Sequence, residues 1–371
     1  MKQLVLLGGG HAHLRVLAEL ANQPLTGWEI RLVTPYRRQI YSGMLPGWIA
    51  GHYPIESCGI ALDALAARSG AVFQESSGVA LNPERNELVC ADGTNLHFDY
   101  LSIDTGPMPA IDQLPGSAEH ALPIRPIERF IAAWPDVLRR IACHGSRFDL
   151  VIVGSGAAGV ELAFAIQRRA ATQGWSHLHL TLLGPDELPL EDAPRALRRQ
   201  AMALLTRREI TWSGRYRALR IQPRQIHFEH GGKLDFDACL VSTGAAAPRW
   251  PAAGGLATDA FGFIRVGPTL QSVSHPQIFA VGDVAAYHDA RPKSGVYAVR
   301  AGPILADNLR AVCEGRCPRR WTPQRTALYL ISTGDRHALA SWGRWSWSGN
   351  WVWHWKDRID RRFMRRFGVA A

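Results

Sequence analysis

The chain has 371 residues, which is long enough for two domains of ordinary size and excludes a single small module. Apolar residues make up 47% and charged residues 20%, a composition typical of a packed protein and not of a disordered one. The formal net charge of +10 favours acidic surroundings, such as dinucleotides, anionic lipid or nucleic acid, without choosing among them.

The cysteines and the apolar runs limit the cellular setting. Six cysteines, at positions 58, 90, 143, 239, 313 and 317, show neither a disulfide framework nor a zinc-site spacing, so we expect a reducing cytoplasm and no metal. Residues 1–7 have no cleavage site and are interpreted as a strand, not a signal peptide. No run of about eighteen uncharged apolar residues occurs, so we expect any membrane contact to be peripheral, at the inner face.

The first predicted nucleotide site lies at the start of the chain. Residues 2–7 have the pattern of a buried strand, and a glycine turn and an amphipathic helix follow them. Gly8 and Gly10 let the backbone turn sharply and approach a diphosphate. The charge of that diphosphate would meet exposed backbone amides at the helix start, around His11 and Ala12.

This first turn departs from the usual dinucleotide pattern at two positions. His13 replaces the third glycine, so we expect the helix to lie less close to the strand. Thr34, at the end of the predicted strand 29–34, replaces the acid that normally binds a ribose hydroxyl and would be a weaker partner. His11 and His13 could add positive charge, but neutral, hydrogen-bonded histidines at the helix start are the favoured interpretation.

The second predicted nucleotide site has the complete glycine pattern. Residues 150–153 form a buried strand, and Gly154, Gly156 and Gly159 precede a helix. Two such turns, each between a strand and a helix, predict two bound dinucleotides and hydride transfer between them. The next strand, 178–183, ends without an acid or an adjacent arginine, so the pattern leaves NADH and NADPH equally open.

Three more segments carry a family resemblance. They read DYLSIDTG at 99–106, CLVSTG at 239–244 and HPQIFAVGD at 275–283. With both glycine turns, they make the chain resemble the two-dinucleotide-domain flavoproteins of the pyridine nucleotide-disulfide oxidoreductase superfamily. The resemblance is to the branch that contains type II NADH:quinone dehydrogenases and sulfide:quinone reductases, and it spans nearly the whole chain.

The resemblance assigns roles to these segments. It implies that FAD binds at the first turn and that Asp283, directly after Gly282, hydrogen-bonds the ribityl chain. It also implies that the chain leaves the FAD domain at one Thr-Gly pair and returns to it at another. These pairs are Thr105-Gly106 and Thr243-Gly244.

Two segments, 41–47 and 292–300, resemble a narrower subgroup, the flavin module fused ahead of selenide, water dikinase in some bacteria. The resemblance implies that both lie against the isoalloxazine ring, with a helix N-terminus near its pyrimidine edge and Lys293 adding positive charge. It also places Glu161 near the nicotinamide as a positioning residue. The remaining cofactor-binding candidates in these segments are Tyr41, Ser42, Gly43, Ser294 and Gly295.

One family feature is missing from the sequence. Disulfide reductases carry a CxxxxC pair beside the first nucleotide motif, whereas this chain has Cys58 alone, so we expect no dithiol relay. Cys313 and Cys317 are four residues apart and could share a helical face, but a structural role is favoured for them. No residue is assigned as a catalytic acid or base, because hydride transfer needs stacking and exclusion of water.

The C-terminal segment is predicted to be an interface. Residues 328–333 and 336–342 read as a hairpin. Six of the thirteen tryptophans then fall between 342 and 355, and basic residues follow. Apolar side chains recur every four residues in a helix from about Asn350, with the basic side chains beside them. This stripe is Trp351, Trp355, Ile359, Phe363 and Phe367.

Several interpretations of residues 342–367 stay open. The stripe could dock on an anionic membrane surface, or pack on the hairpin of the same chain or on a second copy in a homodimer. Nucleic acid is the weakest alternative, because no recognised binding module surrounds the segment. A second hairpin around residues 348–350, with one tryptophan face, would also fit the alternation of residues 345–355.

Together these patterns predict an α/β fold with two Rossmann-like dinucleotide-binding domains. Residues 1–108 and 250–325 are expected to form the FAD domain, residues 109–249 the NAD(P) domain, and residues 326–371 a small C-terminal α+β interface module. The expected reaction is oxidation of NADH or NADPH by bound FAD, with two electrons passed to a quinone. The alternatives are a soluble reductase of a small selenium or sulfur compound, and a redox-sensing flavin-binding protein.

Overall fold

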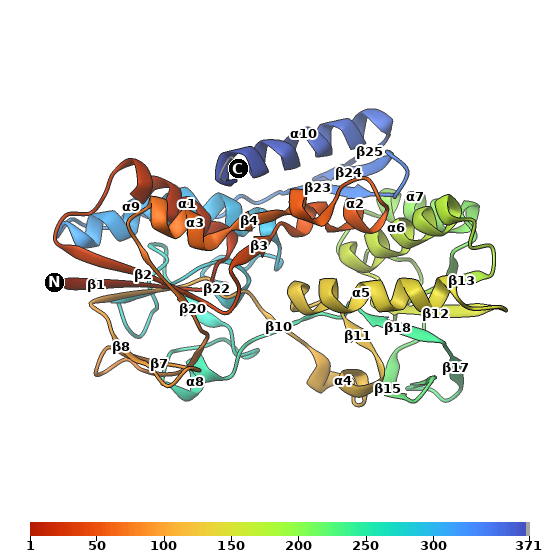
Figure 1. Cartoon of the computed structure of the whole chain (residues 1–371), viewed down its shortest axis with the longest axis horizontal. Coiled ribbons are helices and arrows are strands. Elements are labelled where there is room, and N and C mark those ends of the chain that lie inside the picture. Colours follow the sequence, from red (N-terminus) through yellow and green to blue (C-terminus); the bar gives the residue numbers. More distant parts are fainter. Residues whose placement is uncertain (369–371) are drawn as a thin grey trace.

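The structure, a computed structural model, describes residues 1–368. Two five-stranded parallel sheets lie next to each other, and helix α10 (Asn350–Phe367) crosses above their junction (Figure 1). The predicted α/β fold with two Rossmann-like halves is confirmed.

The first sheet has the strand order β21-β9-β1-β2-β5. Alternate residues of β1 face opposite sides, as the two-residue period of a strand requires. Leu4 and Leu6 pack against helices, whereas Val5 and Leu7 pack against a small antiparallel sheet. The five strands are β1 (Lys2–Leu7), β2 (Trp28–Thr34), β5 (Val72–Glu75), β9 (Tyr100–Ile103) and β21 (Ile278–Ala280). The helices are α1 (His11–Asn22), α3 (Leu62–Arg68) and α9 (Gly295–Cys313), and the small sheet is β6 (Gly78–Asn82), β7 (Glu87–Cys90) and β8 (Asn95–His97).

The second sheet repeats this plan with the order β11-β18-β12-β13-β14. Leu150 and Ile152 pack against helices, and Val151 and Val153 against a second small sheet. The strands are β11 (Leu122–Pro123), β12 (Phe148–Val153), β13 (Leu178–Leu183), β14 (Thr211–Ser213) and β18 (Ala238–Val241). The helices are α5 (Ile127–Ala142), α6 (Ala157–Gln173) and α7 (Arg195–Arg207), and the small sheet is β15 (Ala218–Gln222), β16 (Gln225–Phe228) and β17 (Lys233–Asp235).

Two short antiparallel strands connect the halves. After β9 the chain passes through β10 (Met108–Pro109) to the second half, and after β18 it returns through β19 (Ala245–Ala246), which pairs with β10. Shorter elements surround the sheets. They are β3 (Arg38–Ile40), β4 (Gly59–Ala61), α2 (Leu45–Ile49), α4 (Ser117–His120), α8 (Trp250–Ala253), β20 (Ile264–Val266) and β22 (Ala285–Tyr287).

The C-terminal module is a three-stranded antiparallel sheet followed by α10. Strands β23 (Leu328–Ser332) and β24 (Ala338–Trp342) form the predicted hairpin, and β25 (Trp345–Gly349) adds a third strand. The helix predicted from about Asn350 is confirmed. The alternative second hairpin around residues 348–350 is wrong, because β25 turns back at Gly343 and ends where α10 begins.

Candidate functional site

The first glycine turn lies at the carboxyl end of β1, between β2 and β9. Gly8 has a φ of +98°, and a Cβ atom there would lie 2.4 Å from the carbonyl oxygen of Asp104, so no other residue fits. Thr105 and Gly106 follow β9 at the same edge of the sheet. A Cβ on Gly106 would meet nothing within 4 Å, so open space remains beside this turn.

The carboxyl group of a buried acid, Asp104, lies at the start of α1, and no sequence motif marks it as a site residue. Its Oδ2 accepts hydrogen bonds from the backbone N–H groups of Ala12 (2.9 Å) and His13 (3.1 Å). Gly10 has to be glycine because a Cβ there would lie 2.3 Å from this carboxyl group. Burial raises the pKa of Asp104 to about 7, even though the hydrogen bonds from the two backbone amides lower it.

His13 is a structural residue. Its Nδ1 lies 2.6 Å from the carbonyl oxygen of Gly8 and its Nε2 lies 2.8 Å from the Ser102 hydroxyl, so Nδ1 carries the proton and Nε2 accepts one. Burial lowers the pKa of His13 to about 4. Burial, assisted by Arg125, also lowers the pKa of His11 to about 4, so neither imidazole supplies positive charge at neutral pH.

The second glycine turn is packed more closely. Gly154 has a φ of +115° and approaches Ser242, much as Gly8 approaches Asp104. A Cβ on Gly159 would lie 1.8 Å from the carbonyl oxygen of Gly154, which explains why this copy keeps the third glycine. Gly156 precedes α6, and a Cβ there would meet nothing within 4 Å. Gly156, the residue before α6, has no side chain that could cap the helix start.

Thr243 and Gly244 lie next to the second turn, directly after β18. Thr243 is exposed, and a Cβ on Gly244 would also meet nothing within 4 Å. The two glycine turns and the two Thr-Gly pairs therefore form equivalent arrangements at the carboxyl edges of the two sheets. Ligands of open parallel sheets bind at this edge.

Several charged groups lie beside the first turn. Asp283 follows Gly282 after β21 and forms an ion pair with Arg125, which the chain contributes from the second half (3.6 Å). Burial raises the pKa of Asp283, and Arg125 and Lys293 oppose this shift. Lys293 donates a hydrogen bond to the Ala285 carbonyl (2.5 Å), and burial lowers its pKa.

Helix α9 points its N-terminus into the same region. Ser294 is the residue before α9 and Gly295 is the first residue of the helix. A Cβ on Gly295 would lie 4.0 Å from the His11 ring, so the starts of α1 and α9 face each other. Thr34, by contrast, is buried at the end of β2. Its carbonyl oxygen accepts a hydrogen bond from the N–H of Ser76 (3.1 Å), so this backbone group is already paired within the protein.

Helix α10 closes over the turn formed by Tyr41, Ser42 and Gly43. The Tyr41 ring stacks on Phe363 at 4.4 Å between centroids, and its hydroxyl donates to Asp360 (3.1 Å). The carbonyl of Gly43 accepts a hydrogen bond from Lys356 Nζ (2.5 Å). Lys356 also donates to Asp360 (2.7 Å), so a buried ion pair holds α10 onto this turn.

Glu161 lies on the other side of the same ion pair. Its Oε1 accepts the backbone N–H of Ser332 in β23 (2.8 Å). Burial raises the pKa of Glu161 to about 7, although Lys356 and the Ser332 amide oppose this. Glu161 therefore connects α6 to the C-terminal module. No sequence motif marks Arg125, Lys356 or Asp360 as site residues, because the tertiary structure alone brings them here.

Replacing Glu161 by glutamine is expected to change how stability depends on pH. Folding raises the pKa of the Glu161 carboxyl group to about 7. The free energy of unfolding therefore falls as the pH rises from the pKa of the unfolded chain to about 7. The Glu161→Gln variant should therefore be more stable than the parent at about pH 8 and should lose this advantage near pH 5. Urea unfolding at both values measures this, and an advantage equal at both would contradict it.

The remaining candidates fall outside this arrangement. Cys313 ends α9 and Cys317 lies in the following loop, so the prediction that they could share a helical face is wrong. Cys58 is buried, and burial raises its pKa to about 12. Within residues 1–368, no group of three or more His, Cys, Asp or Glu side chains is placed to hold a metal ion.

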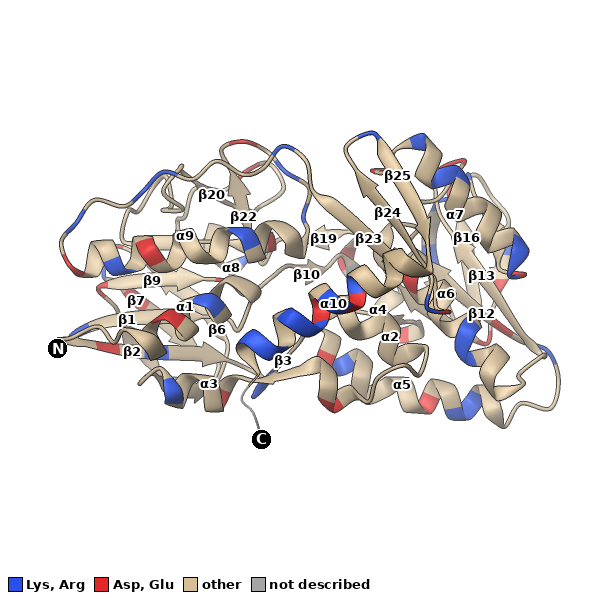
Figure 2. Cartoon of the chain, turned by 90° about the horizontal axis from the view of Figure 1, so that it is seen from above, with Lys and Arg blue, Asp and Glu red and all other residues tan. Residues whose placement is uncertain are grey.

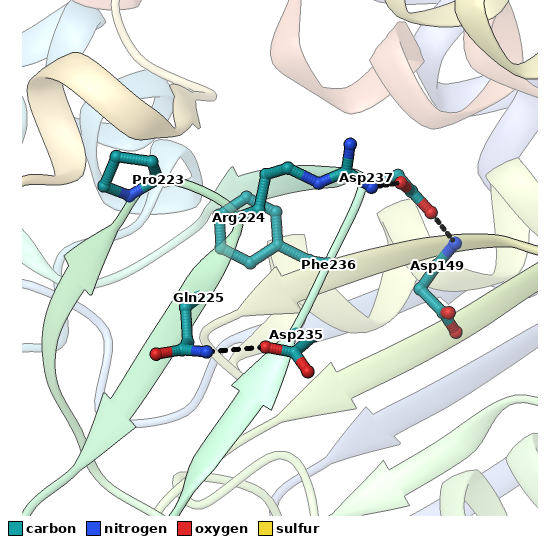
Figure 3. A pocket seen from close by; sticks show the side chains of 7 residues that line it. All are labelled: Asp149, Pro223, Arg224, Gln225, Asp235, Phe236 and Asp237. Atoms are coloured by element: carbon teal, nitrogen blue, oxygen red, sulfur yellow. Dashed lines mark hydrogen bonds and ion pairs between the residues drawn. The ribbon is translucent and has the colours of Figure 1, made fainter.

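A surface pocket lies at the opposite end of the second half. Figure 3 shows Gln225 pointing toward Asp235, and Arg224 toward Asp237, beside Asp149 near the start of β12. Gly154 follows the other end of this strand. The pocket is therefore separate from the carboxyl edge, where the glycine turns lie.

Comparison with known proteins identifies the family. The model for pyridine nucleotide-disulphide oxidoreductases matches residues 2–302. The chain belongs to this family. Membership in the pyridine nucleotide-disulphide oxidoreductases makes FAD and NAD(P)H its cofactors. The open space beside Gly106 at the first turn, and beside Gly156 and Gly244 at the second, leaves room for a diphosphate group at each turn.

Individual members of this family show low sequence identity and a shared fold. The chain is 24% identical over 331 residues to an alternative NAD(P)H-ubiquinone oxidoreductase of Arabidopsis thaliana, covering 78% of this chain and 63% of that protein, which is under two thirds of its length. It is 25% identical to a demethylphylloquinone reductase of Synechocystis sp., covering 90% and 85%. The sulfide:quinone oxidoreductase structure from Aquifex aeolicus superposes with a TM-score of 0.82 at 18% identity, covering 99% and 91%.

Proposed function

We propose that the chain oxidises NAD(P)H through bound FAD and passes two electrons to a quinone taken from a membrane surface. The observation that carries this proposal is an aromatic and basic face on α10 and its hairpin, directly above the turn expected to contact the flavin. The names of the Arabidopsis and Synechocystis relatives, both quinone reductases, support the acceptor.

We infer that FAD lies along the first glycine turn, with its diphosphate at Gly8, Gly10 and His11 and beside Ala12, whose amide already donates to Asp104. Thr34, Thr105 and Gly106 would lie nearby, Gly282 and Asp283 at the ribityl chain, and Lys293, Ser294 and Gly295 at the ring. Tyr41, Ser42 and Gly43 would cover the other side of the ring. Bound FAD would accept a hydride from the nicotinamide and supply the two electrons. We further propose that residues 1–108 and 250–325 form the FAD domain and residues 109–249 the NAD(P) domain.

The nicotinamide dinucleotide is proposed to bind at Gly154, Gly156 and Gly159, beside Thr243 and Gly244. Glu161, one turn into α6, would then position the nicotinamide end while its own carboxyl stays bonded to Ser332. Because burial raises its pKa to about 7, a large share of Glu161 is neutral near pH 7 and does not repel an approaching anion.

The proposed membrane face combines exposed aromatic and basic side chains. Trp342, Trp345, Trp351, Trp355 and Ile359 are all exposed. Figure 2 shows Lys and Arg along α10, and Arg358, Arg362, Arg365 and Arg366 among them are exposed. Tryptophan favours the headgroup region, and each basic residue near anionic lipid contributes about 1 kcal/mol. Within the described residues, no helix is both long and apolar enough to cross a bilayer.

Anaerobic mixing tests the reaction itself. NADH or NADPH should bleach the flavin of the purified protein, and a soluble quinone analogue should restore its colour. A bleached flavin that no quinone reoxidises would remove the quinone and favour a small selenium or sulfur compound as the acceptor. A flavin whose reduction changes the affinity for a partner, without turnover, would favour redox sensing.

Substituting the two exposed tryptophans of α10 tests the membrane face. Trp351 and Trp355 are 55% and 37% exposed, so a Trp351→Ser, Trp355→Ser double variant should keep the fold and its flavin. Its binding to vesicles that contain phosphatidylglycerol should weaken about tenfold or more, because the bilayer no longer buries two aromatic rings. Phe261, which is 81% exposed in the other half, provides a control as Phe261→Ser. Equal vesicle binding by both variants would contradict a membrane role for this face.

A further inference from the structure

The two glycine turns differ in what occupies the start of the following helix. At α1, the carboxyl group of Asp104 already accepts the amides of Ala12 and His13. At α6, Ser242 stands at the position equivalent to Asp104, and serine has no carboxyl group to place at the helix start. The turn assigned to FAD therefore contains an internal acid that the turn assigned to NAD(P)H lacks.

An ionised Asp104 would repel a diphosphate bound at the same helix start. Both groups are anionic, and the carboxyl group is only 3% exposed, so water screens little of the repulsion. The groups around Asp104 do not neutralise it. His13, in α1, is neutral, and both of its ring nitrogens are hydrogen-bonded. The hydroxyl of Tyr287, in β22, accepts a hydrogen bond from the Gly282 amide. Asp283, which follows β21, is another acid.

The nearby cations act elsewhere. Arg125 forms its ion pair with Asp283, and Lys293 bonds the Ala285 carbonyl and lies 3.8 Å from the centre of the Phe263 ring. Arg125 and Lys293 lower the pKa of Asp283, whereas burial and the charge of Asp283 raise the pKa of Asp104. Among the described residues, Asp104 therefore has backbone amides as partners but no countercharge.

We propose that Asp104 is a binding residue for the FAD diphosphate and acts as a neutral carboxylic acid. One oxygen, Oδ2, accepts the two amides of α1, and the other carries a proton that it donates to a diphosphate oxygen. This inference rests on the proposed placement of FAD at the first turn and adds a proton to the binding reaction.

The pH dependence follows from this proton. Burial raises the pKa of Asp104 to about 7 before FAD binds, and the approaching diphosphate favours the neutral form further. Well below pH 7 the proton is already in place, and the Kd for FAD should be independent of pH. Above about pH 7, each FAD that binds takes up one proton, so the Kd should rise about tenfold per pH unit.

Dilution of the FAD-loaded protein measures this dependence, because released FAD fluoresces. We would determine the Kd from about pH 6 to about pH 9 for the parent, Asp104→Asn, Asp104→Ala and a surface control, Asp112→Asn. The amide of Asp104→Asn keeps one acceptor and one donor, as the neutral acid does, so its Kd should match the parent near pH 6 and stay flat. Asp104→Ala should bind FAD more weakly throughout, and Asp112→Asn should follow the parent.

Two results would overturn the proposal. In the first, the Kd of Asp104→Asn for FAD rises with pH above about pH 7 as steeply as that of the parent. In the second, Asp104→Asn binds FAD as weakly as Asp104→Ala near pH 6. If Asp104→Asn failed to fold, a pH indicator would count the protons released with FAD from the parent, and a count near zero at about pH 8 would also overturn the proposal. A parent that binds no FAD would instead remove the proposed function, so the two failures are distinguishable.

Discussion

Replacing Lys356 by methionine is expected to lower the free energy of unfolding by about 3–5 kcal/mol, because it leaves a buried carboxylate without its countercharge. The Lys356 and Asp360 side chains are only 10% and 7% exposed. Burial lowers the pKa of Lys356, but Asp360 and Glu161 outweigh burial and raise it overall, so Lys356 is charged at neutral pH. Urea unfolding followed by circular dichroism measures the loss.

Two further variants test this explanation. A Lys356→Met, Asp360→Leu double variant removes both charges and should recover most of the lost stability. Arg361→Met provides the matched control, because Arg361 pairs with Asp357 on the same helix but is 55% exposed, and an exposed pair contributes at most about 1 kcal/mol. If both single variants lost the same amount, burial of the Lys356–Asp360 pair would not be the cause.

Substitutions in the second glycine turn are expected to separate folding from nucleotide binding. In Gly159→Ala the new methyl would lie 1.8 Å from the Gly154 carbonyl oxygen, so α6 must move. We expect a loss of about 1–3 kcal/mol in stability and a rate of flavin reduction by NAD(P)H lower by about a hundredfold.

Gly156→Ala should behave differently. Its φ of −69° suits alanine, and its methyl would meet nothing within 4 Å, so stability should be unchanged. The methyl would enter the space proposed for the diphosphate, and the KM for both NADH and NADPH should rise at least about tenfold. Gly145→Ala, at another open glycine, is the control. Anaerobic flavin bleaching against nucleotide concentration measures these effects, and normal reduction of Gly156→Ala would place the diphosphate elsewhere.

The sheets and glycine turns were predictable because each depends on a short stretch of chain. A buried apolar run, a glycine pair and a helix start leave little choice of local structure, and the strands and helices begin within one or two residues of their expected positions. Asp104 lies within the family segment 99–106, but nothing in the local pattern marks it as a binding residue. Its function depends on the distance to α1, which lies about 90 residues earlier.

The C-terminal stripe shows how local periodicity gives an incomplete answer. Apolar residues four apart on an α-helix drift by about 40° per step, because four residues make more than one turn. Trp351 and Trp355 therefore face outward, while Phe363 stacks on Tyr41 and Phe367 is buried in the first half. Lys356 and Asp360 lie on the side of the helix opposite Trp351 and therefore face inward, which their charges alone would not predict.

Helix α10 also sets how the two halves can separate. The paired strands β10 and β19 connect the halves below the junction and are placed to act as a hinge, while α10 crosses above it (Figure 1). Phe367 packs α10 into the core of the first half, and the Ser332 amide in β23 attaches the C-terminal module to Glu161 in the second. Any rotation that separates the two halves must loosen one of these attachments. Release of oxidised nucleotide and binding of reduced nucleotide would then require α10 to detach in the same motion, on the microsecond-to-millisecond timescale of domain motions.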